Sequence, residues 1–382
     1  MANVLTDLAA DIYKAADIVG REAVGVIPSV TINAGAEEAA QGDVVRSHYT
    51  RAATVNSSAT PAMTIPEGDD QTVDTKTMTI SQIASVRIPW TGEDMKHVDN
   101  GSGFETVYGD QIKQAFRGIV NTIEAHVATV AYQGASRAFG TAGTTPFGSD
   151  FSEVAEMRQI LLDNGMPVTD GQISLIVNTS AGTNLRQLAQ LQKANESGGT
   201  ELLRQGTLLD LQGFMVKESA QIQAHTKGSG ASYLVNSSPS LAVGTTTIPA
   251  DGGSGTILAG DVVTFAGTAD KYVVNTALAG GEFVIGGPGL RAVEANNDAI
   301  TVGNSYTANL ALHRSGVELA MRPLMKPRGG DAAVDEMIVQ DPFSGLVFRI
   351  SAYKGYNKAM FDVTCLYQAK VWKGDAVAIL LG

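Results

Sequence analysis

Residues 104–132 have the spacing of one long amphipathic helix. The apolar residues that fall on one face of this helix are Tyr108, Ile112, Phe116, Ile119, Val120, Ile123, Val127 and Val130. Gly134 follows and is expected to end the helix. At 1.5 Å per residue the helix spans roughly 40 Å. It is the element that the sequence predicts most clearly.

The segment after this helix predicts a mixed α+β body. Ser152 is expected to cap a helix that runs to Leu162, with acidic residues in its first turn. The stretch "ISLIVNTS" is a short, nearly continuous apolar run and predicts a buried strand. Ser180 is then expected to cap the next helix. The order helix, strand, helix indicates the α+β class.

Glycine content changes near residue 225. Of the 42 glycines, 14 lie between His225 and Thr307, among short β-like pieces such as "SLAVG", "KYVVN" and "GEFVIGG". Short strands with frequent turns favour a compact β-barrel or a small sandwich. Strand-rich sequence returns afterwards, so residues 225–307 are predicted to be inserted into a domain whose strands lie on both sides.

The first ninety residues have no obvious core of their own. Residues 5–19 have helical spacing, and an extended arm is expected to follow them. Residues 62–90 alternate in polarity around the turn sequence "PEGDD", which predicts a long pair of extended strands. A two-stranded excursion is marginal alone in water. We therefore expect it to need a neighbouring element or subunit; alternatively, it lies on its own domain.

Charge and cysteine content exclude several classes of function. The net charge is −12 and there is no run of Lys or Arg, so direct nucleic-acid binding is not expected, whereas a basic partner protein is. Cys365 is the only cysteine and is expected to be a small buried apolar residue. The start of the chain does not resemble a signal peptide, and no window is apolar enough to span a membrane. These features favour synthesis in a reducing cytoplasm.

Motifs for metal or phosphate binding are weak. None of His48, His97, His126, His225 and His313 has a second ligand at metal-binding spacing, and His126 is expected to be packed. The acidic groups at 67–70 and 331–336 lack the spacing of a calcium loop, so they are predicted to be turns or solvated loops. The pieces "DGGSGT" and "GGPGL" do not open a helix and predict turns.

The tripeptide His313-Arg314-Ser315 combines three reactive side chains. On an extended strand, His313 and Ser315 would share a face about 7 Å apart, too far for the hydrogen bond that activates a nucleophile. The alternation from Val317 to Arg322 predicts instead a half-buried strand that ends at Pro323. The sequence therefore predicts no catalytic, cofactor-binding or metal-binding residue.

The order of these elements resembles that of the major capsid (coat) proteins of tailed bacteriophages, above all short-tailed-phage coat proteins with an insertion domain. Two pieces carry the resemblance, "NLALHRSGVELAMRP" after the insertion and "LAGDVVTFAGTADKYVV" within it. The resemblance implies an N-terminal arm at 1–61, an extended β-hairpin loop at 62–90, and a spine helix with the peripheral domain at 91–195. It further implies a first part of the axial domain at 196–224, the β-rich insertion at 225–307, and a second axial part at 308–382 with return strands to the peripheral domain.

The resemblance also implies a function. The chain would be a structural protein, not an enzyme, that assembles into hexamers and pentamers of an icosahedral phage head around double-stranded DNA. Its partners would be copies of itself, a scaffolding protein and a portal, with no membrane, no cofactor and no specific grip on DNA. It would assemble in the host bacterial cytoplasm and end in the virion. The alternatives are an encapsulin-type compartment shell, a β-rich surface adhesion module and a serine hydrolase that uses His313 and Ser315.

Overall fold

The computed structural model describes residues 25–35, 37–50, 61, 63–65, 73–99, 104–192, 210–341 and 345–382. The helix expected at 5–19 and the acidic turn at 67–70 lie outside these residues. So do the side chains of His48 and His97, although their backbones belong to described elements.

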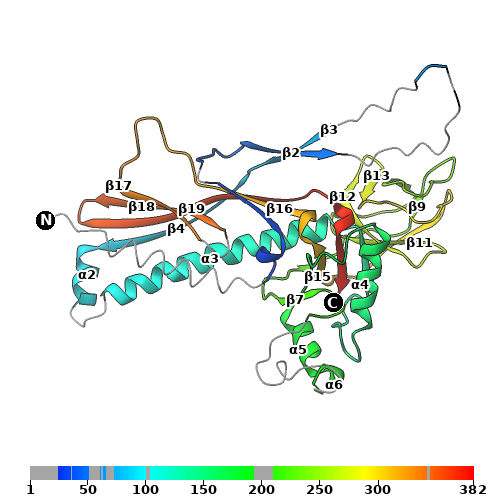
Figure 1. Ribbon diagram of the computed structural model, residues 1–382, viewed down its shortest axis with the longest axis horizontal. Helices are drawn as coiled ribbons and strands as arrows, with labels where there is room; N and C mark the ends of the chain where they lie inside the picture. Colours follow the sequence, from blue (N-terminus) through cyan, green and yellow to red (C-terminus); the bar gives the residue numbers. More distant parts are fainter. Residues whose placement is uncertain are drawn as a thin grey trace.

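The long helix is present as α3 (Phe104–Gln133), which confirms the prediction. It runs along the length of the molecule beneath a sheet (Figure 1). Its apolar face is buried against that sheet, where the Phe116 and Phe348 rings lie edge to face with centroids 4.9 Å apart. Gly134 follows the helix and lies against Val371, where a Cβ would come within 2.5 Å of the Val371 side chain.

The sheet over α3 has six strands with β19 at its centre. Its elements are β1 (Thr31–Ala34), β4 (Gln82–Thr91), β16 (Val317–Arg322), β17 (Ala333–Gln340), β18 (Val347–Gly355) and β19 (Lys358–Val371). The order is β1-β16-β19-β18-β17, and β4 pairs with the free edge of β19. A short helix, α2 (Gly92–Asp99), joins β4 to the start of α3. Strand β16 has the expected bounds, although its central residues Leu319, Ala320 and Met321 are all buried rather than alternating.

The extended two-stranded ribbon exists, but its strands differ from those predicted. β2 (Val44–Thr50) pairs antiparallel with β3 (Val73–Thr79), and this ribbon projects above the sheet (Figure 1). β4 turns away and pairs with β19 over its whole length, from Gln82 to Thr91. The pairing predicted within 62–90 is therefore wrong. Alternating polarity fits either partner, and only the tertiary structure selects β2 for β3 and β19 for β4.

A second layer surrounds the last strand of the chain. It contains β5 (Arg137–Gly140), α4 (Ser152–Asp163), β6 (Ile173–Val177), α5 (Thr179–Gln187), α6 (Ala189–Gln192), β7 (Met215–Glu218), β15 (Tyr306–His313) and β20 (Val377–Leu381). The strand order β5-β20-β15-β6-β7 forms one sheet, and α4 and α5 share a buried cluster with it. Most of this layer packs in a cluster of its own, although Ala135, Ala138 and Ile176 belong to the cluster that contains α3.

Both predicted serine caps are misplaced: the N-cap of α4 is Phe151, one residue before Ser152, and the N-cap of α5 is Asn178, two residues before Ser180. Asp150 accepts hydrogen bonds from the Ser152 backbone N–H and hydroxyl at 2.9 and 2.6 Å, so Ser152 is the first residue of α4 rather than its cap. Asn178 caps α5 by accepting from the Ala181 N–H at 2.9 Å. Asp and Asn cap helices as well as Ser does, and the spacing of apolar residues does not distinguish adjacent candidates.

The glycine-rich block folds into a closed barrel. Its strands are β9 (Tyr233–Val235), β10 (Thr247–Asp251), β11 (Val262–Phe265), β12 (Lys271–Ala279), β13 (Glu282–Ile285) and β14 (Ala299–Val302). They pair in the cycle β11-β14-β9-β10-β13-β12, and β12 returns to β11. The barrel has its own buried core, which includes Tyr272 and Phe283. The inserted β-barrel is thus confirmed, although "SLAVG" forms only a single bridge at Leu241.

The chain enters and leaves the barrel at one place. β8 (Ala224–His225) pairs with the start of β15, with His225 opposite Tyr306 and Ala224 opposite Thr307. The barrel also joins the second layer edge to edge, because β12 pairs with β5 through Lys271–Ala138 and Tyr272–Arg137. In Figure 1 the barrel lies at the right-hand end of α3, next to α4.

Candidate functional site

His313 and Ser315 do come within hydrogen-bond distance, contrary to the spacing argument. The chain leaves β15 at His313 and enters a short 3-10 turn at Arg314–Gly316, which folds Ser315 back. His313 Nδ1 lies 2.8 Å from Ser315 Oγ, and His313 Nε2 lies 2.8 Å from Asp170 Oδ2. The prediction that the two side chains stay apart is therefore wrong, because it assumed a strand that continued past His313.

Ser315, His313 and Asp170 stabilise the 3-10 turn through hydrogen bonds. The Ser315 backbone N–H donates to His313 Nδ1 at 3.2 Å, so the ring nitrogen caps the 3-10 turn. The hydrogen bond from His313 lowers the pKa of Asp170, so Asp170 accepts and Nε2 carries the proton. A ring nitrogen already shared with a backbone donor is a poor general base for the hydroxyl beside it. These hydrogen bonds thus explain the geometry of the loop, and no catalytic role is needed to account for them.

Two further histidines, His126 and His225, are packed in the body and at the base of the barrel. The His126 ring lies edge-on against Tyr367 with centroids 5.4 Å apart, and burial lowers its pKa. His225 bonds to Asp261 at the base of the barrel. The described residues contain no group of three or more side chains suited to hold a metal ion. Cys365 is buried, and burial raises its pKa to about 12, so the thiol stays protonated.

The acidic segment 331–336 is engaged in ion pairs. Its second half belongs to β17 rather than to a solvated loop. Glu336 lies 2.9 Å from the guanidinium of Arg349 and also pairs with Lys326. Asp331 accepts from the Tyr353 hydroxyl at 2.5 Å, which lowers the pKa of Asp331. These carboxylates hold the edge of the sheet.

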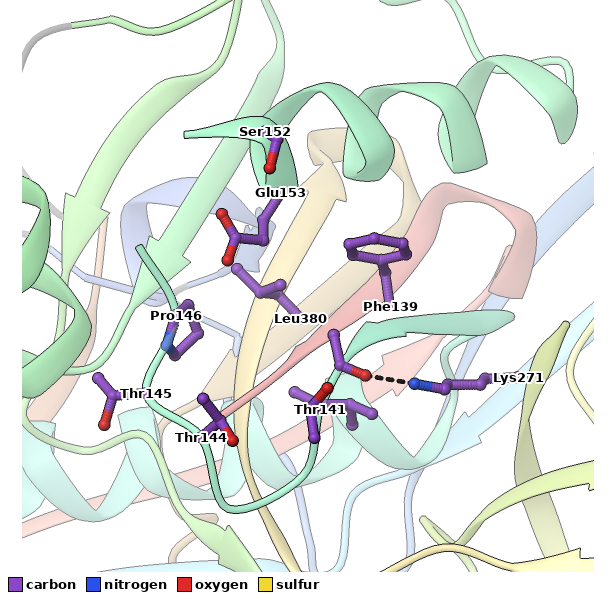
Figure 2. A pocket seen from close by; sticks show the side chains of 11 residues that line it. Phe139, Thr141, Thr144, Thr145, Pro146, Ser152, Glu153, Lys271 and Leu380 are labelled. Carbon is purple, nitrogen blue, oxygen red and sulfur yellow. Dashed lines mark hydrogen bonds between the residues drawn. The ribbon is translucent and has the colours of Figure 1, made fainter. Parts of the chain in front are cut away.

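A pocket of about 310 Å³ lies between the loop at 140–147, the start of α4 and β12 (Figure 2). Lys271 donates to the carbonyl of Gly140, and burial lowers the pKa of this lysine. Glu153 accepts from the Phe147 N–H through Oε1, whereas Oε2 is buried without a hydrogen-bond partner. One engaged amine and one spare carboxylate oxygen do not define a ligand class, so the pocket is best described as packing between three elements.

The part of the arm at residues 25–30 is attached to α3 by a buried carboxylate. Glu124 accepts from the Val26 N–H at 2.9 Å and from the Ser219 hydroxyl at 2.7 Å. Val26, Ile27 and Val30 are fully buried in the core under the sheet. Gly25 is required there, because a Cβ would overlap Glu124. The last part of the arm is thus an integral part of the body.

Two buried groups hold the barrel to the body. Asp261 accepts from the Gly228 and Leu258 N–H groups at 3.0 and 2.7 Å and lies 2.8 Å from His225 Nε2. The His225 ring packs against Tyr132 at the end of α3 and against Tyr306. These contacts fix the barrel at the place where the chain crosses into it.

A chain of alternating charges forms the second contact of the barrel. Arg137 on β5 is buried and lies 3.5 Å from Asp270 of the barrel and 3.4 Å from Asp163 at the end of α4. Asp163 in turn accepts from Arg291 of the barrel at 2.6 Å. One ion pair thus joins an arginine of the body to an aspartate of the barrel, and the other joins an arginine of the barrel to an aspartate of the body.

The β2–β3 ribbon is fixed only at its base. Ile80 packs with Leu366 and Ala39. The Gly42 N–H donates to the Ile80 carbonyl at 2.8 Å, and the Ile80 N–H donates to the Asp43 carbonyl at 2.9 Å. Lys76 donates to the Trp372 carbonyl at 2.6 Å. In the part of the chain that the structure describes, β2 and β3 pair only with each other. The ribbon is thus a two-stranded arm attached to a rigid support.

The residues that attach the arm and the barrel to the body carry only weak signals in the sequence. Glu124 lies on the apolar face of α3, one turn after Val120, and Asp261 stands alone in the apolar run "LAGDVVTF". A lone carboxylate in such a position predicts a buried hydrogen-bonded anchor. Asp170 and Arg137 carry no comparable local signal, because their partners are distant in sequence.

No protein-family model matches the chain, and no curated protein matches it in sequence. Among solved structures, the capsid of cyanophage P-SCSP1u aligns over 94% of this chain and 88% of its own, with 12% identity and a TM-score of 0.52. A structure from Mycobacterium phage Che8 aligns over 89% and 84% of the two chains (14% identity, TM-score 0.47). A virus-like particle from Pyrococcus furiosus aligns over 98% and 100% (7% identity, TM-score 0.45). The cyanophage alignment shows that this chain shares the phage capsid fold. The α+β body and the inserted barrel are observed in this chain itself.

Proposed function

We propose that this chain is the major capsid protein of a tailed bacteriophage, which assembles into hexamers and pentamers of an icosahedral head around double-stranded DNA. The observation that carries the proposal is the fold shared with the cyanophage capsid over 94% of the chain. A fold alone does not determine function, so the proposal also needs surfaces that suit assembly.

Two features of the structure supply such surfaces. The β2–β3 ribbon extends away from the body (Figure 1), and a two-stranded ribbon gains little stability in water by itself. The edge of β4 is paired on one side only among the described residues. A closed shell repeats contacts between unlike surfaces, and projecting ribbons and open edges provide these contacts.

The packing clusters suggest how the chain divides into functional parts. In this proposal the arm ends before Val44, and the loop contains the β2–β3 ribbon. The peripheral unit is then α3 with β4 and β17–β19. The axial unit contains residues 134–224 together with β15 and β20. Residues 225–307 are the insertion, bounded by the His225–Tyr306 pair.

Charge supports the proposed partners. At a net charge of −12, a shell of these chains repels DNA phosphates, which suits a container that encloses DNA without gripping it. A scaffolding protein with a basic binding region would find complementary charge here, and a portal would replace one pentamer. In this proposal assembly occurs in the bacterial cytoplasm and the product is the virion. Within the described residues, no helix combines the length and apolarity needed to cross a membrane.

The protein is not an enzyme in this proposal. The one arrangement that resembles a catalytic triad, Ser315 with His313 and Asp170, is explained as a turn cap, because the Ser315 N–H occupies the same ring nitrogen that would act as base. A hydrolase function would need that nitrogen to be free for the hydroxyl proton.

Co-expression tests the proposal. The chain is produced alone and together with the gene that lies upstream of its own, and the products are sized by sedimentation and imaged by electron microscopy. Uniform closed shells support a capsid protein, and terminase, portal and scaffold genes beside it distinguish a phage head from an encapsulin-type compartment. A chain that stays monomeric in both preparations contradicts the proposal.

A further inference from the structure

A short turn, residues 372–376, joins the long strand β19 to the last strand β20 and touches several separate parts of the chain. It contains the 3-10 turn η3 (Gly374–Ala376). The Trp372 and Lys373 N–H groups donate to the Gly316 carbonyl at 2.8 and 3.3 Å. In Figure 1 the turn lies at the right-hand end of α3, where the red last strand begins. The body thus fixes the start of the 372–376 turn.

The base of the ribbon rests on one side of this turn. Lys76 of β3 donates to the Trp372 carbonyl at 2.6 Å, and Lys370 donates to the Thr77 carbonyl at 2.5 Å. Lys370 also lies 5.1 Å from the centroid of the Trp372 ring, and the indole N–H donates to Glu318. An ammonium group over an indole ring is attracted to it. Two lysines, one from the ribbon and one from the body, therefore hold the ribbon to the turn.

A loop of the barrel rests on the other side of the turn. This loop follows β13 and begins with Gly286 and Gly287. A Cβ at Gly287 would lie 2.7 Å from Asp375 Oδ1, and a Cβ at Gly286 would lie 2.2 Å from the Ala135 carbonyl oxygen. A Cβ at Gly374 would lie 3.6 Å from the Gly287 nitrogen. Glycine at these positions thus brings the backbone of the barrel loop directly against the turn and the end of α3.

The Asp375 carboxylate connects the two sides. It is half-buried against the Gly287 backbone; burial raises its pKa, whereas attraction to Lys76, and more weakly to Lys373, lowers it. The Asn164 amide donates to the Asp375 backbone carbonyl at 2.9 Å and holds the residue in place. A partly buried carboxylate is destabilising when no cation or donor compensates its charge. Without Lys76, water would have to take over this role, and the barrel loop covers one side of the carboxylate.

We infer that the 372–376 turn couples the position of the ribbon to the position of the barrel loop. When the ribbon tilts and Lys76 leaves the Trp372 carbonyl, Asp375 loses its stronger cation, and the loop at Gly287 moves away to admit water. The coupling is reciprocal, because two sites that are linked by an interaction free energy affect each other equally. It is a property of a single chain, so it goes beyond the proposed function and does not depend on it. In an assembly, contacts of the ribbon would thereby set the position of the barrel.

Hydrogen exchange of the full chain, followed by mass spectrometry, tests the coupling at a concentration at which sedimentation shows no assembly. In Lys76→Met, the amides of residues 284–290 are expected to exchange at least about fivefold faster than in the unmodified protein. The Gly286 and Leu290 N–H groups in this segment are hydrogen-bonded, so their exchange reports the opening of the loop. Arg46→Met is the control, because Arg46 is an exposed cation on the same ribbon, and it is expected to leave this exchange unchanged.

A double variant shows whether Asp375 carries the coupling. Asp375→Asn removes the charge that Lys76 compensates. Lys76→Met is therefore expected to cause no further increase in the exchange of residues 284–290 when it is added to Asp375→Asn. The Val235 N–H, which donates to the Asp298 carbonyl within the barrel, is expected to exchange at the same rate in all variants. This amide separates an opening of the loop from a general loosening of the barrel.

The reverse direction is tested with Gly287→Ala, whose methyl group would displace the Asp375 carboxylate. The Gly42 and Ile80 amides, which are hydrogen-bonded at the base of the ribbon, are expected to exchange at least about fivefold faster in this variant. Unchanged exchange at the base of the ribbon overturns the reciprocal coupling.

Four results in the forward direction would also overturn the inference. They are unchanged exchange of residues 284–290 in Lys76→Met, an equal increase in Arg46→Met, an effect of Lys76→Met that persists with Asp375→Asn, and an equal increase at Val235. Since the measurement uses the unassembled chain, none of these results bears on shell formation, which the co-expression experiment tests separately.

Discussion

His225 and Tyr306 lie opposite each other as a backbone pair at the base of the barrel, with ring centroids 5.3 Å apart. Eighty residues of chain leave and return between them, yet the neighbouring Lys227 N–H still donates to Ser305 Oγ at 3.1 Å. The two crossing strands are therefore close enough to be joined directly. This proximity is the structural basis for treating the barrel as an insertion.

Deletion of residues 228–304, replaced by a short Gly-Ser turn, is expected to leave a folded but less stable body. The deletion removes Asp261 and its bond to His225, and it removes Asp270 and Arg291, which pair with Arg137 and Asp163 of the body. It keeps the aromatic contacts among Tyr132, His225 and Tyr306. A loss of about 2–6 kcal/mol is expected, because two buried charged interactions are lost at about 1–3 kcal/mol each. Urea denaturation followed by circular dichroism measures it. An unfolded product at all urea concentrations, or an unchanged midpoint, contradicts the expectation.

Glu294 is expected to make the barrel less stable as the pH rises. Burial, followed by repulsion from Asp298 and Asp270, raises the pKa of this carboxyl to about 7 from an ordinary value of 4.5. Its Oε1 is also buried without a hydrogen-bond partner. Because the folded state holds the proton more tightly than the unfolded state, the stabilisation is complete below pH 4.5 and is lost as the pH rises through 7.

Glu294→Gln removes this titration. The melting temperature of the variant, relative to the unmodified protein, is expected to be higher at pH 8 than at pH 5, as measured by scanning calorimetry. Glu282→Gln serves as the control, because Glu282 is exposed on the same barrel. If the melting temperatures of Glu294→Gln and the unmodified protein differ by the same amount at pH 5 and pH 8, the carboxyl does not titrate in this range.

Glu124→Ala is expected to loosen the arm. Without the carboxylate, the Val26 N–H and the Ser219 hydroxyl lose their buried acceptor. An unsatisfied buried donor costs about 1–3 kcal/mol, so the variant loses about 2–5 kcal/mol if neither donor finds water. Limited proteolysis is expected to cut before residue 31 faster in this variant, whereas Glu282→Ala, on the barrel surface, digests like the unmodified protein. Equal digestion of Glu124→Ala and the unmodified protein contradicts the anchor.

Ser315→Ala is expected to have little effect on assembly. No hydrolytic activity is expected to depend on Ser315. The hydroxyl adds one hydrogen bond to a turn that the Ser315 backbone N–H already closes, so the cost is about 1 kcal/mol or less. A fluorophosphonate probe, which labels activated serines, is expected to leave Ser315 unmodified, as judged by mass spectrometry. Labelling that disappears in Ser315→Ala and in His313→Ala would establish a catalytic serine.

Local patterns in the sequence predicted the elements that depend on local physics. The helix over residues 104–132 matches α3, because its spacing reports one buried face regardless of what covers it. The buried strand at Ile173–Val177 and the end of β16 before Pro323 were predictable for the same reason. The glycine-rich block predicted a small barrel or sandwich, because short strands joined by frequent turns can form few other compact folds.

Features that depend on distant partners were not predictable. Ile83 pairs with Leu366 across 283 residues, and nothing in the alternation of β4 favours this partner over β3. The contact between His313 and Ser315 depends on a 3-10 turn at Arg314–Gly316, where the spacing argument assumed an extended strand. Arg137 finds Asp270 and Asp163 only after β5 and β12 have paired. In each case the decisive partner comes from tertiary structure.

Electron microscopy of the unmodified chain, co-expressed with its upstream gene, tests the central claim most directly. The account predicts closed shells of uniform diameter, with six-fold and five-fold clusters of subunits in averaged images. Particles of this kind would place the ribbon, the open β4 edge and the barrel in one assembly. A preparation that contains only monomers or irregular aggregates, although the chain is folded by circular dichroism, would contradict it.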